Sequence, residues 1–253
     1  MAIQKTDAII LRTMPFRSTS LIVTFFSKSF GKVRGLVKGV RQEGENRGAV
    51  YELFTNMEIV YYEKTRSDLH LISEAFVLDS YTALHARLES IAYASYFAEL
   101  VDEVSEVHDP HGEIFSLLDF VFCYLSCVPG TRIARLFEIK LLNEVGWLPY
   151  LDGCLSCKKG PLEKGFFSPK LGGLLCGDCV SGFPDAKPLH SEPLAVMRYY
   201  IGHDLDACLK LGMTGQSETE LEIFMARFLT ERLSRPLKSS LFLQKVKPAF
   251  LAQ

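Results

Sequence analysis

The sequence predicts an α+β protein, with an all-β domain at its N-terminus and an all-α domain after it. Three observations lead to this prediction: short strand-like segments over residues 1–80, a helical period from Tyr81 onward, and four cysteines arranged as two C-x-x-C pairs within the helical part. We therefore expect one domain over residues 1–80, a second over 81–253, and a cysteine-containing insert over 150–184 inside the second domain.

The N-terminal segments are rich in β-branched and aromatic side chains. They read TDAIILRT, SLIVTFF, GKVRGLVKG, MEIVYYEK and LHLISEAFVL, and Gly, Ser, Asn or charged clusters separate them. No helical pattern intervenes between them. Five short strands of this kind favour a small closed barrel, and the five-stranded OB-fold is the commonest such barrel that binds nucleic acid.

The helical region begins where hydrophobic residues recur at steps of three and four. This period runs from Leu84 to Val104 and predicts one amphipathic helix. Capping and stop signals predict four more helices: about 113–127, Thr131 to Val145 with Gly146 as its stop, one opened by Ser191, and one that begins at a capping box of Ser217 and Glu220 and ends near Leu233.

Two cysteine pairs follow the third predicted helix. Cys154 and Cys157 are separated by two residues, as are Cys176 and Cys179, and 18 residues lie between the pairs. This spacing is typical of a site in which four thiolates hold one Zn²⁺ ion. We expect Gly177 to relieve crowding at the second pair and GFFSPKLGGLL to form a hairpin, which makes the insert a zinc ribbon. Four sulfur ligands leave no position for water or substrate, so a single ion per chain would be structural.

Other uses of the thiols fit the sequence less well. A thioredoxin-like redox pair needs a βαβ pattern, which surrounds neither C-x-x-C pair, and a disulfide needs an oxidising compartment. A nucleobase deaminase combines H-x-E with a later P-C-x-x-C, and His111-Gly112-Glu113 supplies the first motif. However, Gly153 rather than proline precedes Cys154, and a deaminase has no role for the second pair. The remaining thiols are expected to be small buried hydrophobic residues: Cys123, Cys127 and Cys208.

The N-terminus and the most apolar run predict a protein of the cytoplasm. The opening MAIQKTDAIILRT lacks the pattern of a signal peptide. The run from Ile114 to Val128 is too short to span a bilayer and contains Asp119, so a buried helix is expected there. A Ser/His/Asp triad, a P-loop and a dinucleotide fingerprint are not visible in the sequence, although a triad dispersed along the chain stays open.

Charge is distributed unevenly along the chain. Residues 1–42 contain eight basic side chains and one acid, a net +7, whereas residues 81–130 contain one basic side chain and eight acids, a net −7. A basic segment in a near-neutral protein favours a polyanion at one surface. The alternative is a solvated edge whose lysines prevent sheet-to-sheet aggregation.

The basic residues alternate in the segment GKVRGLVKGVR. As a strand, it places Lys32, Arg34, Leu36 and Lys38 on one face and Val33, Gly35 and Val37 on the other. Three cations on one face form a track for phosphates. The aromatic residues near this strand are more often core than stacking platforms for bases: Phe16, Phe54, Tyr61 and Tyr62.

The segment DAIILRTMPFRSTSLIVTFFSKSFGKVRGLVKGVR resembles the N-terminal OB-fold of the bacterial recombination mediator family RecO. The helical region with its four cysteines and the late RPLKSSLFL resemble the same family, in the same order and over essentially the whole chain. Two positions depart from the family pattern, Ser18 and Leu53, and neither lies in the basic strand.

The resemblance implies a non-enzymatic role in DNA repair and recombination, at the bacterial nucleoid. RecO proteins bind single- and double-stranded DNA, anneal complementary strands, and act with RecR to load RecA onto strands covered by single-stranded DNA-binding protein (SSB). The DNA contacts would map to Lys28, Lys32, Arg34, Lys38, Arg41 and, with less support, Arg17. The acidic, aromatic-ended SSB tail needs an apolar pocket with cations at its rim, for which Arg132, Arg135, Arg198 and Arg235 are candidates. The rival interpretation is a generic OB-fold and zinc-ribbon protein of RNA metabolism or transcription.

Overall fold

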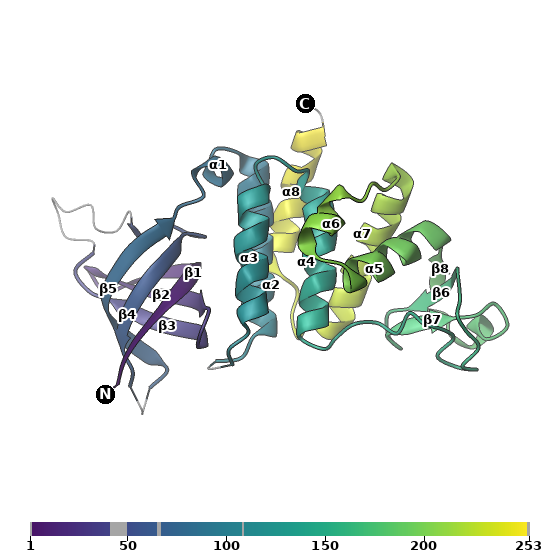
Figure 1. Ribbon diagram of the computed structural model, residues 1–253, viewed down its shortest axis with the longest axis horizontal. Helices are drawn as coiled ribbons and strands as arrows, with labels where there is room; N and C mark the ends of the chain where they lie inside the picture. The colour runs from purple at the N-terminus through teal and green to yellow at the C-terminus, as the bar shows by residue number, and fades with distance from the viewer. Residues whose placement is uncertain (1, 41–49, 65–66, 108, 252–253) are drawn as a thin grey trace. The chain divides into compact units, whose positions relative to one another are not determined.

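The computed structural model describes residues 2–40, 50–64, 67–107 and 109–251. Contacts divide the chain into two compact units: a first unit of Met1–Val128 with Leu237–Gln253, and a second unit of Pro129–Pro236. The first unit contains a barrel and the helices next to it, and the second contains further helices and a small sheet (Figure 1). The last helix of the chain therefore belongs with the first unit.

Five strands of the first unit form a closed barrel. They are β1 (Ile3–Phe16), β2 (Ser20–Ser27), β3 (Gly31–Val37), β4 (Asn56–Tyr62) and β5 (Leu69–Asp79). They close in the order β1-β2-β3-β5-β4, and all neighbours are antiparallel except β3 and β5 (Figure 1). A closed five-stranded barrel followed by a helical region confirms the predicted fold class.

Residues of all five strands, together with Val40 beyond the end of β3, fill the barrel interior. It contains Ala8, Ile10, Val23, Phe25, Val33, Val37, Val40, Met57, Ile59, Tyr61 and Ile72. Gly35 also faces inward, and a Cβ at this position would lie 2.5 Å from Ile72 Cδ1. Glycine is therefore required where β3 passes close to the side chain of β5.

Four α-helices belong to the described part of the first unit: α1 (Thr82–His85), α2 (Leu88–Val104), α3 (Gly112–Tyr124) and α8 (Lys238–Leu251). The single helix predicted from Leu84 is interrupted, because Arg87 adopts an extended backbone between α1 and α2. Helices α2 and α3 pack on the barrel at β1. Glu99 of α2 accepts hydrogen bonds from the N–H groups of Lys238 and Ser239, which start α8, so RPLKSSLFL begins a capped helix.

A hydrogen-bonded cluster joins the barrel to α3. Asp119 of α3 accepts hydrogen bonds from Asn56 Nδ2 of β4, at 3.1 Å, and from the Tyr81 hydroxyl. Burial and this carboxylate raise the pKa of Tyr81 far above its usual value. The rings of Phe54 and Tyr81 both meet Phe122 edge to face. The acid that interrupts the apolar run therefore fastens the helix to the barrel.

The second unit contains α4 (Gly130–Glu144), α5 (Ser191–Gly202), α6 (Leu205–Lys210) and α7 (Gly215–Arg232). A three-stranded sheet in the order β7-β6-β8 accompanies them, made by β6 (Gly165–Ser168), β7 (Gly173–Leu175) and β8 (Lys187–Leu189), with a short 3₁₀ helix at Val180–Gly182. The predicted capping box at Ser217 is wrong. Thr214 is the N-cap of α7, since its side chain accepts a hydrogen bond from the Ser217 N–H.

None of the helices within the described residues combines the length and the apolar character needed to cross a membrane.

Candidate nucleic-acid interface and metal centre

The burial pattern of β3 shows the predicted alternation. Val33, Gly35 and Val37 are buried toward the barrel interior, and Lys32, Arg34 and Leu36 are partly exposed on the outside. The cations of this strand therefore lie on the outer wall of the barrel, but they do not share one environment.

Lys32 lies where the helices cover the barrel. Its Nζ is 3.0 Å from Asp102 Oδ1 of α2, and it also donates a hydrogen bond to the Asp102 carbonyl. Only 13% of the Lys32 side chain and 18% of the Asp102 side chain are exposed. Phe26 is its neighbour across the sheet on the same outward face and is fully buried. Lys32 thus has a carboxylate partner within the protein, and its contact with DNA stays a prediction. Lys28, in the turn between β2 and β3 at this same end, is exposed.

Arg17 and Lys38 lie together at the opposite end of the barrel. Leu21, at the start of β2, pairs with Val37 at the end of β3, and the preceding turn holds Arg17. Both cations are exposed, and the Arg17 guanidinium lies 5.3 Å from the centre of the Phe16 ring. Arg34 lies between the two ends, half-buried, with an Nε that has no hydrogen-bond partner.

The register adds a cation that the basic strand did not reveal. Arg12 of β1 pairs with Thr24 of β2, which in turn pairs with Arg34 of β3, so the two arginines flank one threonine on the outer face. Arg12 is exposed. Strand pairing is needed to place Arg12 beside Arg34, so the alternation along β3 alone does not indicate it. Arg41, the remaining predicted contact, lies outside the described residues.

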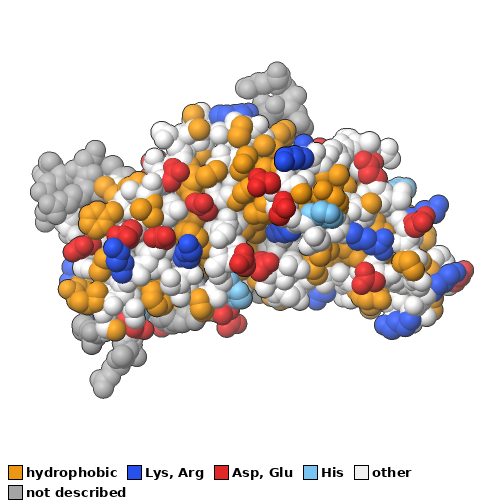
Figure 2. Space-filling model, in the orientation of Figure 1, with side chains coloured by type: hydrophobic (Ala, Val, Ile, Leu, Met, Phe, Trp, Pro, Cys, Tyr) orange, Lys and Arg blue, Asp and Glu red, His pale blue; other side chains and the backbone are white. Residues whose placement is uncertain are grey.

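The surface of the barrel is not uniformly basic. On the face shown in Figure 2, Lys and Arg side chains are scattered among acidic and hydrophobic ones. Lys5 of β1, for example, is paired with Glu58 of β4 at 2.9 Å. Of the four aromatic residues considered, Phe54 and Tyr61 are buried, whereas Phe16 and Tyr62 are partly exposed.

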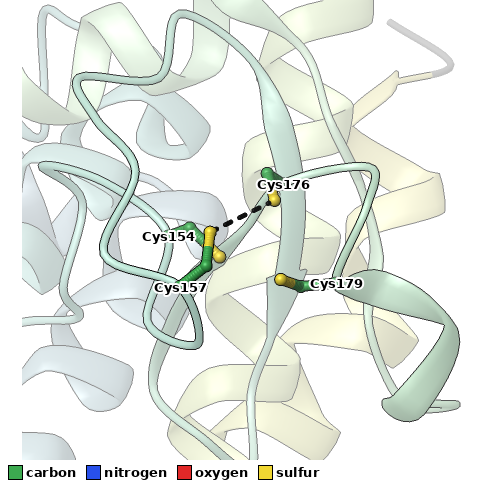
Figure 3. A group of neighbouring side chains, drawn as sticks. All are labelled: Cys154, Cys157, Cys176 and Cys179. Carbon is green, nitrogen blue, oxygen red and sulfur yellow. Dashed lines mark hydrogen bonds between the residues drawn. The ribbon is translucent and has the colours of Figure 1, made fainter.

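The four predicted metal ligands converge in the second unit. One sulfur from each of Cys154, Cys157, Cys176 and Cys179 lies within 4.8 Å of the others, and the thiols point toward one another (Figure 3). The Cys157 and Cys176 sulfurs are 3.7 Å apart. A tetrahedron with metal–sulfur bonds of about 2.3 Å has sulfur–sulfur edges of about 3.8 Å. The cluster is thus positioned to hold a metal ion with four sulfur ligands.

Tight turns aim the sulfurs at this point. The N–H of Lys158 donates to the Cys154 carbonyl in the first turn, and the N–H of Cys179 donates to the Cys176 carbonyl in the second. Burial by itself raises the pKa of the Cys154 thiol, but the backbone N–H groups of Cys157 and Cys176 outweigh burial and lower its pKa to about 6. Amides that donate to sulfur favour the thiolate, which is the form that binds metal.

The glycines that this lobe needs are not the one expected. A Cβ at Gly177 would meet nothing within 4 Å, so the proposed relief of crowding there is wrong. Gly153 and Gly160 instead lie back to back, and a Cβ at Gly153 would lie 2.8 Å from the Lys159 carbonyl oxygen. The predicted hairpin is present as β6 and β7, with β8 added to it.

The other cysteines and the H-x-E motif have no part in the cluster. Cys208 is buried as expected, but Cys123 and Cys127 are exposed, which contradicts the prediction for these two. His111 directly precedes α3 and contacts Asp109 Oδ2 at 2.9 Å. Within the described residues, the cluster that fits a metal contains cysteines alone.

An apolar pocket lies in the second unit beside α7 and the small sheet. Its lining consists of Phe167, Pro169, Lys187, Pro188, Leu189, Glu220, Ile223, Phe224 and Arg227. Three of the four arginines considered for such a rim contact other groups of this unit. Arg132 donates to the carbonyls of Leu209 and Leu211, Arg198 to those of Leu151 and Leu162, and Arg135 pairs with Glu138.

Comparison with known proteins identifies the same family over nearly all of this chain. The family profile "Recombination protein O N terminal" matches residues 1–81, and "Recombination protein O C terminal" matches residues 85–241. The DNA repair protein RecO of Anaeromyxobacter dehalogenans is 30% identical, with 96% of this chain and 97% of the relative covered. The RecO proteins of Pelotomaculum thermopropionicum and Syntrophus aciditrophicus are 28% and 27% identical and cover 97% of this chain each.

Proposed function

The chain belongs to the RecO family, and we propose that it is a DNA repair and recombination mediator without catalytic activity. It binds single- and double-stranded DNA at the barrel, anneals complementary strands, and acts with RecR to promote loading of RecA on SSB-coated strands. The observation that carries this proposal is the set of outward cations on the barrel wall away from the helices: Arg12, Arg17, Arg34 and Lys38.

Phosphate contacts suit a mediator that must act on any sequence. Affinity that comes from lysine and arginine is blind to the bases, and it releases counterions, so it falls as salt rises. Annealing further requires that the bound strand keep its bases free to pair. Cations on the outside of a convex barrel wall meet both requirements.

The salt dependence of binding tests the site. Replacing Arg34 and Lys38 with alanine should weaken binding of all single-stranded sequences alike and lower the slope of log affinity against log salt by roughly 0.7 per lost contact. Lys5→Ala is the matched control, since this exposed cation of the same barrel is paired with Glu58. An unchanged slope in the double variant would place the DNA elsewhere on the protein.

Annealing of SSB-coated oligonucleotides separates this function from its rival. The proposed mediator should accelerate annealing of complementary strands that SSB covers. A generic OB-fold and zinc-ribbon protein would leave annealing at its uncatalysed rate and bind RNA at least as tightly as DNA. That result would overturn the mediator function while leaving the family assignment intact.

The pocket beside α7 is the site we propose for the SSB tail. Its apolar lining suits an aromatic terminal residue, and Lys187 and Arg227 supply positive charge for an acidic peptide. Binding of a fluorescent SSB-tail peptide should fall at least tenfold in Arg227→Ala and stay unchanged in Lys164→Ala, which removes an exposed cation of the same unit that does not line the pocket. Equal affinity of both variants would exclude this pocket.

The four cysteines hold a structural Zn²⁺ ion in this proposal. Bound zinc would fix the two turns that present Cys154 and Cys176 and leave no coordination position for a reacting group. Elemental analysis of the purified chain should give one zinc per molecule, and a chain that folds fully without metal would contradict this role.

A further inference from the structure

The outer wall of the barrel contains a row of apolar side chains that the cationic strand does not explain. Met14 of β1 pairs with Ile22 of β2, Ile22 with Leu36 of β3, and Leu36 with Leu71 of β5. Residues paired directly across a sheet share a face, and Leu36 points outward, so all four side chains lie on the outside of the barrel. Met14 is 45% exposed, Leu36 and Leu71 are half-buried, and Ile22, between them, is only 8% exposed, so the first three supply the accessible apolar surface.

Cations border this row on both sides. On one side, one step of two residues along each strand, lie Arg12 and Arg34. On the other side, Lys38 follows two residues after Leu36, and Arg17 follows the end of β1. Strands rise about 3.3 Å per residue, so each border is about 7 Å from the apolar row. The order of cation, apolar side chain and cation therefore holds on β1 and β3, whereas Thr24 and Ser20 occupy the corresponding positions of β2 between them.

The apolar row and the cations beside it together indicate which kind of ligand binds this surface. A ligand that follows this row must present apolar surface to the centre and negative charge to the edges. An unpaired nucleic-acid strand has this chemistry, since its bases have apolar faces and its phosphates are anionic. A duplex does not, because its bases are stacked inside. The row crosses four strands spaced about 4.8 Å apart and is therefore about 14 Å long, enough for two or three bases.

We infer that Met14, Leu36 and Leu71, which flank the buried Ile22, contact the bases of a single strand that runs across the strands of the barrel, not along β3. This inference rests on the proposed function and specifies how its site distinguishes single strands from duplex. The contact surface lies on the outer wall of the barrel, on side chains that point away from its interior. A base resting on it keeps its pairing edge exposed, which annealing requires.

Oligonucleotides with and without bases provide the test. We would measure affinity by fluorescence anisotropy for an oligothymidine, for an abasic strand of the same length and charge, and for a duplex. In the Met14→Ala, Leu36→Ala double variant, affinity for oligothymidine should fall roughly fivefold to tenfold. Affinity for the abasic strand and the duplex, and the salt slope, should not change. Leu88→Ala removes an exposed leucine of the same unit and is the control.

Each other outcome overturns the inference. Equal loss for the thymidine and abasic strands would mean that the row supports the barrel or the phosphate contacts. No loss for any DNA, with weakened RecR binding, would make the row a protein-docking surface.

The direction of the strand is tested separately by single cations. A path across the barrel predicts that Arg12→Ala weakens binding as much as Arg34→Ala, whereas Lys28→Ala has little effect. The reverse order would place the strand along β3 and overturn the inference while preserving the proposed function. No effect of Arg34 and Lys38 together would instead remove the proposed DNA site itself.

Discussion

The barrel and the cysteine-containing lobe are stabilised by different means. Eleven buried residues form the barrel cluster, all apolar except for the hydroxyl of Tyr61. The lobe's own cluster has four buried residues, and two of them are the ligands Cys154 and Cys176. A segment with so few apolar side chains gains little from burial, so the metal ion that we propose there would substitute for a core. Two β-structured regions of one chain can therefore be stabilised differently, one by an apolar core and the other by a metal site.

Arginine side chains that donate hydrogen bonds to backbone carbonyls connect several segments of the second unit. Arg198 of α5 donates hydrogen bonds to the carbonyls of Leu151 and Leu162, on either side of the first cysteine pair. Arg132 of α4 does the same for Leu209 and Leu211 at the end of α6. In the barrel, the corresponding backbone groups are paired strand to strand. In the lobe, long cationic side chains supplement the short ladder of β6, β7 and β8.

Removal of one metal ligand should have the largest effect on stability, and it should unfold the lobe while the barrel stays folded. Cys154→Ser is expected to abolish zinc binding and unfold the lobe, since structural zinc sites supply roughly 10 kcal/mol or more of folding free energy. Hydrogen exchange should rise over residues 150–190 while the amides of β1 to β5 stay protected. Cys127→Ser is the control, as this thiol is exposed and outside the cluster. Loss of protection in the barrel at the same time would contradict the separation.

A cavity in the barrel interior should have the opposite consequence: it should destabilise the barrel and leave the lobe's zinc site intact. Phe25 is fully buried in the interior, and Phe25→Ala should lower the free energy of unfolding by about 3–5 kcal/mol through lost burial and the cavity left behind. Zinc content should remain unchanged. Phe76→Ala, at an exposed position of β5, should change stability by less than about 0.5 kcal/mol in the same denaturant titration. Similar losses in both variants would show that the barrel interior does not dominate its stability.

Sequence patterns predicted the features that depend on local spacing. All five strands follow from alternating β-branched and aromatic residues, and the cysteine cluster follows from two short turns that are each encoded within four residues. The predicted outward direction of Lys32, Arg34 and Leu36 also follows from the period of a strand. Features of this kind need no knowledge of distant partners.

What could not be predicted depends on residues far apart in the chain. The partner of Lys32 is Asp102, 70 positions away, and no local sequence pattern predicts that pair. The apolar row on the barrel wall appears only once the strand register is known, because Met14 and Leu71 belong to strands that are distant in sequence. Cys123 and Cys127 were expected inside from their apolar neighbours, but they lie on the exposed side of their segment. A helical period does not reveal which face stays uncovered when the helix packs.

The arginine that fastens the lobe should have an intermediate effect. Arg198→Met keeps much of the side-chain volume but removes the donor from two carbonyls, and hydrogen bonds to charged groups contribute about 1.5–3 kcal/mol each. We expect the lobe to lose about 2–3 kcal/mol and to release zinc to a chelator at lower concentration. The single tryptophan, Trp147, lies in the same unit, so its fluorescence reports this transition. Lys164→Met should leave zinc release unchanged, and equal release from both variants would deny Arg198 this role.

The smallest effect concerns a carboxylate of the second unit and depends on pH. Glu192, in the first turn of α5, accepts hydrogen bonds from the Ser217 hydroxyl at 2.7 Å and from the Thr214 N–H at 2.9 Å, at the start of α7. These donors, the Ser217 hydroxyl first, lower the pKa of Glu192 below its usual value of 4.5. A group whose pKa falls on folding contributes stability above its unfolded pKa, and this contribution disappears as the pH drops through its folded pKa.

Glu192→Gln should therefore lower the melting temperature slightly at pH 7, and the difference from the unmodified chain should shrink below about pH 4.5. Trp147 fluorescence measured between pH 3 and pH 8 follows this unit alone. Glu113→Gln, an exposed glutamate in the first turn of α3, is the control. A difference that stays constant across this pH range would show that Glu192 acts through its shape and not its charge. In that case, the charged side chains that stabilise the second unit, and distinguish it from the barrel, would be its arginines and cysteines only.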